Sequence, residues 1–172
     1  ERLTGHAPSA RGFIHHLMNG GADQNAAPPA ESADTSSRAE PQKQEAPDWP
    51  ARVARGEDIG RIEIPRLRIS SIVRQGVDDG TLSRAVGHVP YTALPGQRGN
   101  VGLAAHRDSY FRELRGISEG DLIRLITPKG TFEYRVESLK IVFPTNVEVL
   151  DPTPDPSLTL VTCYPFTYIG AA

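Results

Sequence analysis

Short runs in which apolar and polar residues alternate occur through the second half of the chain, and this period of two is typical of strands with one buried face. Arg61–Ile64 shows the alternation most clearly, and Pro65 ends the run. Lys129-Gly130 indicates a tight turn that joins two strands into a hairpin. The expected strands cover residues 61–64, 67–69, 72–73, 101–105, 121–126, 131–142 and 158–161. Many short strands with frequent turns predict a mainly β fold, either a closed barrel or a sandwich.

The N-terminal part of the chain has a different composition. Residues 1–21 are polar and glycine-rich, with one apolar cluster whose spacing permits a short helix of marginal stability. This cluster consists of Phe13, Ile14, Leu17 and Met18. Residues 22–48 contain no Leu, Ile, Val, Met or aromatic side chain, so they cannot bury enough apolar surface to build a core. We therefore expect a marginal helix within residues 1–21, a disordered linker over residues 22–58 and a folded domain over residues 59–172.

Two further segments favour something other than a strand. Asp78 or Asp79 can cap a short helix that continues through Leu82 and stops at Gly87. Trp49–Arg55 is expected to form either a short helix or a strap over the domain. The fold class is therefore mainly β with short helices.

Composition and charge exclude several classes of protein. The 172 residues are 38% hydrophobic and carry a net charge of −2 without a long block of one sign, so no nucleic acid is expected as a partner. No zinc or phosphate-loop motif is present, and His15-His16 has no further ligand nearby, so we expect no metal and no cofactor. The chain has a single cysteine and therefore no internal disulfide. It has no apolar run long enough for a membrane span, and because it begins at Glu1 we expect a membrane anchor in a removed upstream segment.

Two of the predicted strands end in reactive side chains. His106 follows the small, apolar stretch 101–105, and Cys163 follows the strand that begins at Leu158. A thiolate is a strong nucleophile, and a neighbouring imidazole either lowers the pKa of the thiol or serves as acid and base. The two residues lie far apart in the sequence, so only the fold can bring them together. From the residues alone, a buried structural Cys163 and a hydrogen-bonded structural His106 remain alternatives.

A series of motifs resembles one family. Thr159-Leu-Val-Thr-Cys163 is similar to the TLxTC box of sortases, the cysteine transpeptidases of bacterial surfaces, and Tyr164-Pro-Phe166 resembles the continuation of that box in class D. Further matches, in the same order as in the family, are Gly76–Leu82, Val86–Pro90, Thr92–Gly96 and Gly99–Asp108. Together the motifs cover residues 59–172 and are most similar to class D sortases.

The resemblance implies roles for individual residues. Cys163 corresponds to the nucleophile of the family and His106 to its catalytic histidine. Thr162 matches a position that often helps to place the substrate, and His88 lies in a Gly-His turn that we interpret as structural. No metal and no cofactor are implied.

The resemblance also implies an eight-stranded β-barrel and a two-step reaction. The thiol would cleave an LPxTG-like sorting signal after its Thr through a thioacyl-enzyme, and an amine on peptidoglycan or on a protein lysine would release the product. The implied partners are thus the sorting-signal peptide of surface proteins and an amine acceptor, at an extracytoplasmic, membrane-anchored location in bacteria. The alternatives are a sortase-like module that binds without turnover and a cysteine peptidase that releases surface peptides.

One departure from the family concerns the end of the chain. The family has a catalytic arginine on a final strand downstream of the cysteine, whereas this chain ends at Ala172. Arg107, Arg112 and Arg115 do not match the place of that arginine. We therefore expect a barrel that lacks its final strand, with the Cys163 strand as an open edge, in a chain that is nearly inactive and prone to dimerise.

Overall fold

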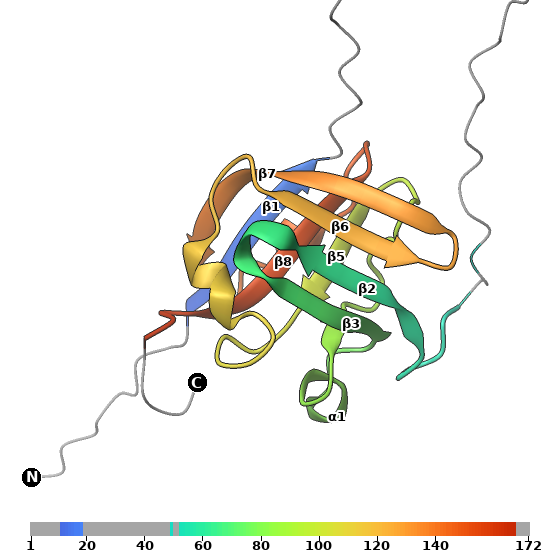
Figure 1. The fold of residues 1–172 in the computed structure, drawn as a ribbon, viewed down its shortest axis with the longest axis horizontal. Helices are drawn as coiled ribbons and strands as arrows, with labels where there is room; N and C mark the ends of the chain where they lie inside the picture. Colours follow the sequence, from blue (N-terminus) through green and yellow to red (C-terminus); the bar gives the residue numbers. More distant parts are fainter. Residues whose placement is uncertain (1–10, 19–48, 50–51, 168–172) are drawn as a thin grey trace, which may run out of the picture.

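The computed structural model describes residues 11–18, 49 and 52–167. Their strands are β1 (Arg11–Met18), β2 (Asp58–Ile64), β3 (Ile69–Gln75), β4 (Val86–His88), β5 (Asn100–Ala104), β6 (Leu122–Thr127), β7 (Gly130–Val142) and β8 (Ser157–Tyr164). The helical segments are short: η1 (Pro65–Leu67), α1 (Asp79–Leu82), η2 (Arg112–Gly116) and η3 (Val147–Leu150). The mainly β fold with short helices that the sequence predicts is confirmed (Figure 1).

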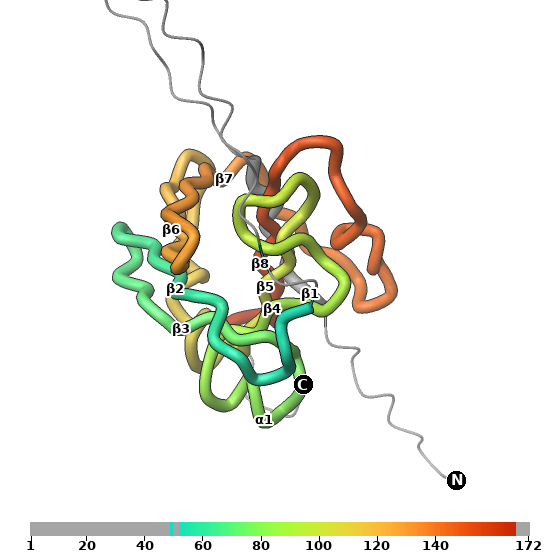
Figure 2. The backbone as a smooth tube through the Cα atoms, turned by 90° about the vertical axis from the view of Figure 1, so that its right-hand side faces the viewer, coloured from blue at the N-terminus to red at the C-terminus, as the bar shows by residue number. Residues whose placement is uncertain are grey.

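The strands form a closed barrel in the order β1-β7-β6-β2-β3-β4-β5-β8. Seven of them, β2 to β8, make a nearly closed barrel, and β1 lies in the remaining gap between β7 and β8, antiparallel to both. Figure 2 shows strands β2 to β8 around a common interior. Most neighbours are antiparallel, but β3 with β4 and β5 with β8 are parallel. The β5–β8 pair is the important one for function, because parallel neighbours end at the same side of the barrel.

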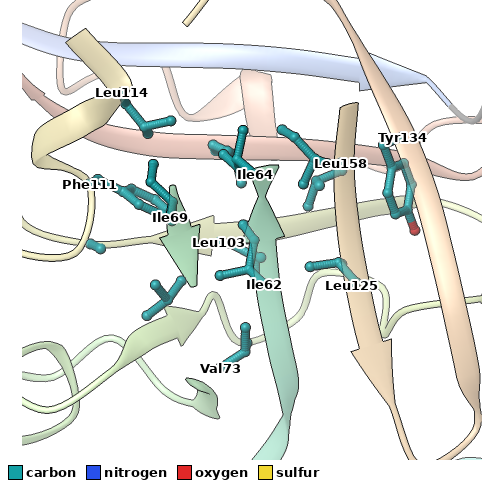
Figure 3. Close-up of a cluster of buried hydrophobic side chains, with 14 of the residues drawn as sticks. Ile62, Ile64, Ile69, Val73, Leu103, Phe111, Leu114, Leu125, Tyr134 and Leu158 are labelled. Carbon is teal, nitrogen blue, oxygen red and sulfur yellow. The ribbon is translucent and has the colours of Figure 1, made fainter. Parts of the chain in front are cut away.

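The interior is filled by apolar side chains from every strand of the seven-stranded part (Figure 3). The largest fully buried side chains are Ile59, Ile62, Ile64, Leu103, Phe111, Leu114, Ile123, Leu125, Tyr134, Leu158 and Leu160. Each contributes roughly 1.5–3 kcal/mol when it leaves water. On β2, the buried Ile62 and Ile64 alternate with less buried neighbours, as the sequence pattern predicts.

Gly87 shows how closely β4 packs against the preceding segment. A Cβ atom at this position would lie 2.3 Å from the backbone oxygen of Gly76 and 2.8 Å from Cδ2 of Leu82. Because a backbone oxygen cannot give way like the end of a flexible side chain, only glycine fits here. The short helix α1 lies in the connection between β3 and β4, and the Asp78 side chain caps it by accepting from Thr81 N.

Two expectations about the barrel and its N-terminal region are wrong. Residues 11–18 form strand β1 rather than a marginal helix, and β8 is not an open edge, because it pairs with both β5 and β1. Both differences have the same physical reason. A short isolated helix is only marginally stable, whereas a strand between β7 and β8 forms hydrogen bonds with the free backbone donors and acceptors of both neighbouring strands. The barrel therefore closes within the chain.

The linker predicted over residues 22–58 ends earlier than expected. Asp58 already belongs to β2, Gly56 N donates to Gln75 O at 2.8 Å, and Trp49 Nε1 donates to Pro95 O at 2.9 Å. Trp49 and residues 52–57 thus lie against the domain like the expected strap. Residues 22–48 lie outside the described residues, and their disorder stays a prediction.

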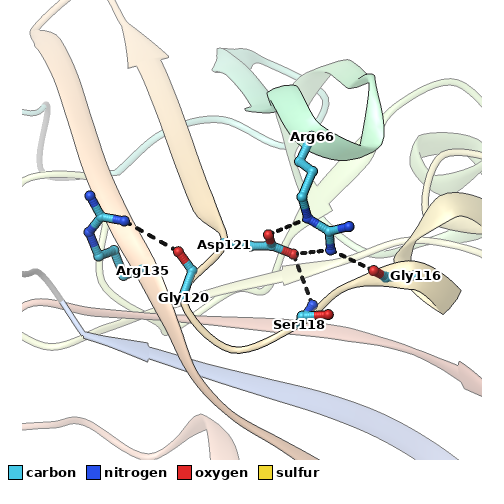
Figure 4. A network of polar contacts seen from close by, with 6 residues as sticks. All are labelled: Arg66, Gly116, Ser118, Gly120, Asp121 and Arg135. Carbon is cyan, nitrogen blue, oxygen red and sulfur yellow. Dashed lines mark hydrogen bonds and ion pairs between the residues drawn. The ribbon is translucent and has the colours of Figure 1, made fainter.

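A polar network anchors the segment that follows the candidate histidine (Figure 4). The Arg66 guanidinium binds both carboxylate oxygens of the buried Asp121 and also donates to Gly116 O at 2.6 Å. Ser118 N donates to the same carboxylate at 2.8 Å. The hydrogen bond from Arg66 is the main reason that the pKa of Asp121 is lowered. Together these contacts tie η1 to the turn that enters β6.

Candidate functional site

His106 lies just beyond the end of β5, and Cys163 is the last residue but one of β8, the parallel neighbour of β5. In the β5–β8 register Ala104 pairs with Val161, and the ladder extends by one further bond, from Ala105 N to Val161 O at 3.2 Å. Each candidate residue is two positions beyond the Ala104–Val161 pair. Because neighbouring strands are about 4.8 Å apart, the structure brings these two residues, which are distant in the sequence, to the same level of the barrel.

The burial pattern places both side chains on the outer face. Ala105 and Thr162 are buried, while Ala104, His106, Val161 and Cys163 are half-buried or exposed. Since successive side chains of a strand point to opposite faces, His106 and Cys163 share the face that is turned away from the core. The thiol is half-buried and free of any disulfide, and the imidazole is exposed to solvent. A free thiol and a reachable imidazole at one strand end are the groups that nucleophilic catalysis requires.

Thr162 directly precedes Cys163 on β8, and its side chain is buried. Its side chain is 4% exposed, and its hydroxyl donates to the backbone oxygen of Ala105 at 2.8 Å. The residue before the cysteine is thus bonded to the residue before the histidine. The hydroxyl is therefore bonded to the protein backbone, and it does not face the outer surface where a substrate would bind.

The loops that precede β5 and β8 cover the other end of this outer face. A Cβ atom on Gly102 would lie 2.9 Å from Cδ2 of Leu150, 3.0 Å from Cγ2 of Thr92 and 3.1 Å from Cβ of Val89. The β4–β5 loop and η3 therefore lie directly on β5 at Gly102. Two positions further along the strand, at Ala104, the outer face is only half-buried. The accessible part of the face begins there and leads to His106 and Cys163.

His88 is buried and fully engaged, in agreement with a structural role. Its Nε2 donates to Ala93 O at 2.9 Å, and its Nδ1 lies 2.8 Å from the side-chain amide oxygen of Gln75. The imidazole is 2% exposed, and burial lowers its pKa. His88 therefore holds the β4–β5 loop through its bond to Ala93 O, and its burial favours the neutral ring.

The three arginines near His106 have different surroundings. Arg112 donates to Asp108 O, and Arg115 pairs with Glu113, so both act within their own segment. Arg107 instead donates from Nη1 to Pro165 O at 3.2 Å, across 58 positions of sequence. The sequence contains no signal for this contact, because only the fold brings the two segments together.

The part of the chain that the structure describes shows neither a metal centre nor a membrane-spanning helix. Within it, no group of three or more His, Cys, Asp and Glu side chains is arranged to hold a metal ion. Its helices are too short to cross a membrane.

Comparisons with known proteins agree with this fold. The family model described as the sortase domain matches residues 62–172. The chain is 33% identical to Sortase D of Bacillus subtilis over 118 residues, which cover 68% of the chain and 60% of that relative. It is also 33% identical to Sortase SrtE1 of Streptomyces coelicolor, covering 69% of the chain and 41% of that relative. The chain thus spans about half the length of these curated relatives.

Solved structures give the same result. The structure of a Clostridium perfringens Sortase D5 transpeptidase superposes with a TM-score of 0.63 at 27% identity, covering 67% of this chain and 75% of that one. Sortase C of Clostridium perfringens, solved with the C-terminal cell wall sorting motif, superposes with a TM-score of 0.62 at 30% identity, covering 66% of this chain and 65% of that one. The family match extends over more than half of the chain and includes both strand ends that carry His106 and Cys163. The chain belongs to the sortase family.

Proposed function

We propose that this chain is a cysteine transpeptidase in which Cys163 is the nucleophile and His106 the acid and base. One observation carries the proposal: both residues lie two positions beyond the Ala104–Val161 pair of parallel strands, on the same outer face. Sortases are transpeptidases of bacterial surface proteins, and the family match supports the reaction class.

The proposed substrate is an LPxTG-like sorting signal that is cleaved after its Thr. The thiolate of Cys163 attacks the carbonyl carbon of that Thr, and a tetrahedral intermediate forms. When the peptide C–N bond breaks, His106 gives a proton to the leaving amine, and a thioester to Cys163 remains. An acceptor amine then attacks the thioester carbon, loses a proton to His106, and expels the Cys163 thiolate. The chain returns to its starting state, with one amide bond broken and one formed.

Thr162 belongs to the proposed site as the residue that helps to place the substrate. Its buried hydroxyl is bonded to Ala105 O, so its contribution is made through the strand rather than by direct contact of the hydroxyl with the peptide. A peptide that lies over Ala104 and Val161 would have its Thr carbonyl beside Cys163. The proposed steps use the thiol and the imidazole alone and call for no metal or cofactor.

The proposed setting is the outer surface of a bacterial membrane. The substrates are sorting signals of surface proteins, and the acceptor is an amine of peptidoglycan or of a protein lysine. The support is the family match and the neighbour that was solved with the C-terminal cell wall sorting motif. Attachment to the membrane is part of this proposal.

Amine-dependent ligation is the direct test. The chain is incubated with a fluorescent LPxTG-type peptide, with and without an excess of a glycine or lysine amine, and the products are separated by mass. Because β1 closes the barrel, the proposal departs from the near-inactivity expected for an open edge. It predicts a ligated product that requires the amine and that disappears in Cys163→Ala and His106→Ala. Arg115→Gln, which removes one charge from an exposed ion pair, is the matched surface control and should retain activity.

Three other outcomes overturn the proposal. Cleavage that does not respond to added amine identifies a peptidase. Binding of the peptide without any turnover identifies a binding module. Turnover that survives in Cys163→Ala removes the thiol from the mechanism.

A further inference from the structure

We propose that Thr162 and Arg107 are positioning residues that together hold Cys163 and His106 at a fixed separation. This inference rests on the proposed function, because it concerns the same two residues. It adds Arg107 to the site, and it gives the Thr162 hydroxyl a role on the protein itself rather than on the substrate.

The need for such residues follows from where the ladder ends. Strand β5 ends at Ala104, and the last backbone bond between the two strands runs from Ala105 N to Val161 O. His106 and Cys163 both lie beyond this bond. The His106 side chain is exposed, so core packing does not fix the imidazole. A thiol and an imidazole that exchange a proton need a close and constant distance, and a misplacement of about 1 Å can cost ~100-fold in rate.

Thr162 supplies one connection, on the core side of the pair. Its hydroxyl donates to Ala105 O at 2.8 Å, with both partners buried, so the bond is shielded from water. Each partner is directly followed by a candidate catalytic residue. The bond therefore fixes the two strands relative to each other at the last position before the chemistry.

Arg107 supplies the second connection, on the far side of the pair. It directly follows His106, and its Nη1 donates at 3.2 Å to the backbone oxygen of Pro165, two residues after Cys163. One hydrogen bond thus joins the residues directly before His106 and Cys163, and the other joins residues that follow them. Two points of attachment prevent a rotation of the segments that a single bond would allow.

A disulfide probe measures the separation without relying on catalysis. His106→Cys gives a chain with two thiols. The effective concentration of one thiol at the other is obtained from the equilibrium of disulfide formation in glutathione buffers. We expect a disulfide between positions 106 and 163. Adding Thr162→Val should lower the effective concentration by about tenfold or more, because the hydroxyl is lost while the shape is kept. Thr162→Ser, which retains a hydroxyl, should restore it to within about twofold of the starting value.

Matched controls separate positioning from general stability. Thr159 is another buried hydroxyl of β8 that donates to β5, to Asn100 Oδ1 at 2.8 Å, but it lies earlier on the strand, away from the candidate site. Thr159→Val should lower the melting temperature like Thr162→Val and leave the 106–163 effective concentration unchanged. Arg107→Gln should lower the 106–163 effective concentration, whereas Arg115→Gln, with the same loss of charge in an exposed pair, should not.

The outcomes separate the failure of this inference from the failure of the proposed function. An unchanged effective concentration in both Thr162→Val and Arg107→Gln overturns the positioning role, even if the enzyme is active. In the chain with His106 intact, the inference further predicts that Thr162→Val lowers kcat more than it raises KM and that Thr162→Ser recovers kcat. Loss of ligation activity in every variant, with the disulfide results as expected, would count against the proposed reaction alone.

Discussion

Gly12 lies directly opposite Cys163 in the antiparallel pairing of β1 with β8. The strand that closes the barrel therefore has a residue without a side chain at the position facing the candidate nucleophile. A larger residue is found at every other β1 position that is paired with β8, from Arg11 to Met18. Closure of the barrel and access to Cys163 are thus compatible at this point of the register.

The first prediction tests that register. Gly12→Cys should form a disulfide with Cys163 under mild oxidation, because directly opposite residues of antiparallel strands have Cα atoms roughly 4.5–5.5 Å apart, within the range that a disulfide spans. His16→Cys, which is opposite Thr159, is the matched control and should not form one. Non-reducing gel electrophoresis and peptide mapping give the answer. Equal oxidation of both variants, or bonds only between chains, would show that β1 does not occupy this place in its own barrel.

The second prediction concerns the buried His88. Burial lowers its pKa below the ordinary value of 6.5, so the folded state favours the neutral ring and the unfolded state binds the proton more readily. The stability that follows from a neutral His88 is complete above about pH 6.5 and is lost as the pH falls towards the lower folded pKa. The melting temperature should therefore fall between about pH 7.5 and pH 5, a window that stays above the usual pKa range of carboxylates, about 4.

Two variants isolate the contribution of His88. His88→Gln keeps a polar side chain in place of the ring and should flatten this pH dependence, at some cost in stability at neutral pH. Arg115→Gln changes an exposed ion pair, leaves His88 in place and should keep the slope. A slope that is the same in His88→Gln as in the unchanged chain would assign the dependence to another group.

The third prediction concerns the Arg66–Asp121 network. Because Arg66 donates to Asp121, the pKa of this carboxyl is lowered, and its contribution to stability is present above the usual value of 3.8 and lost as the pH falls towards the folded pKa. Asp121→Asn should lower the urea midpoint at neutral pH, and the difference from the unchanged chain should shrink below about pH 4. Glu133→Gln, which breaks the exposed pair with Arg124, should have little effect. A difference that does not depend on pH would contradict the ionic origin of the effect.

The fourth prediction concerns Gly87. Gly87→Ala places a Cβ atom against the backbone of Gly76, so it should cost roughly 1–3 kcal/mol or more in unfolding free energy. Gly116→Ala is the control, because its nearest neighbour would be Cδ2 of Leu67 at 3.5 Å, an ordinary contact. Chemical denaturation of both variants decides the matter. If Gly87→Ala is as stable as Gly116→Ala, β3 and β4 are not packed as described.

The sequence was sufficient for the parts of the fold that depend on local pattern. The alternation in 61–64 and the apolar run 101–105 correspond to β2 and β5, and the turn at Lys129-Gly130 joins β6 to β7. His106 and Cys163 were identified as strand-end residues, since the strands before them have clear apolar patterns. Their catalytic roles remain proposals.

The parts that the sequence did not reveal depend on contacts between distant segments. The cluster at Phe13 fits a helix or a strand by spacing, and only the two free edges of β7 and β8 decide in favour of β1. The bonds from Thr162 to Ala105 and from Arg107 to Pro165 join residues that are 57 and 58 positions apart. No local pattern predicts such contacts, because they arise from the parallel register of β5 and β8.

The intact mass of the protein after brief incubation with an LPxTG-type peptide shows whether Cys163 is the nucleophile. The account predicts a mass increase equal to the acyl part of the peptide up to its Thr, located at Cys163 by fragmentation, sensitive to hydroxylamine, and lost in Cys163→Ala. An unmodified Cys163 during turnover, or the same adduct in Cys163→Ala, would contradict the account.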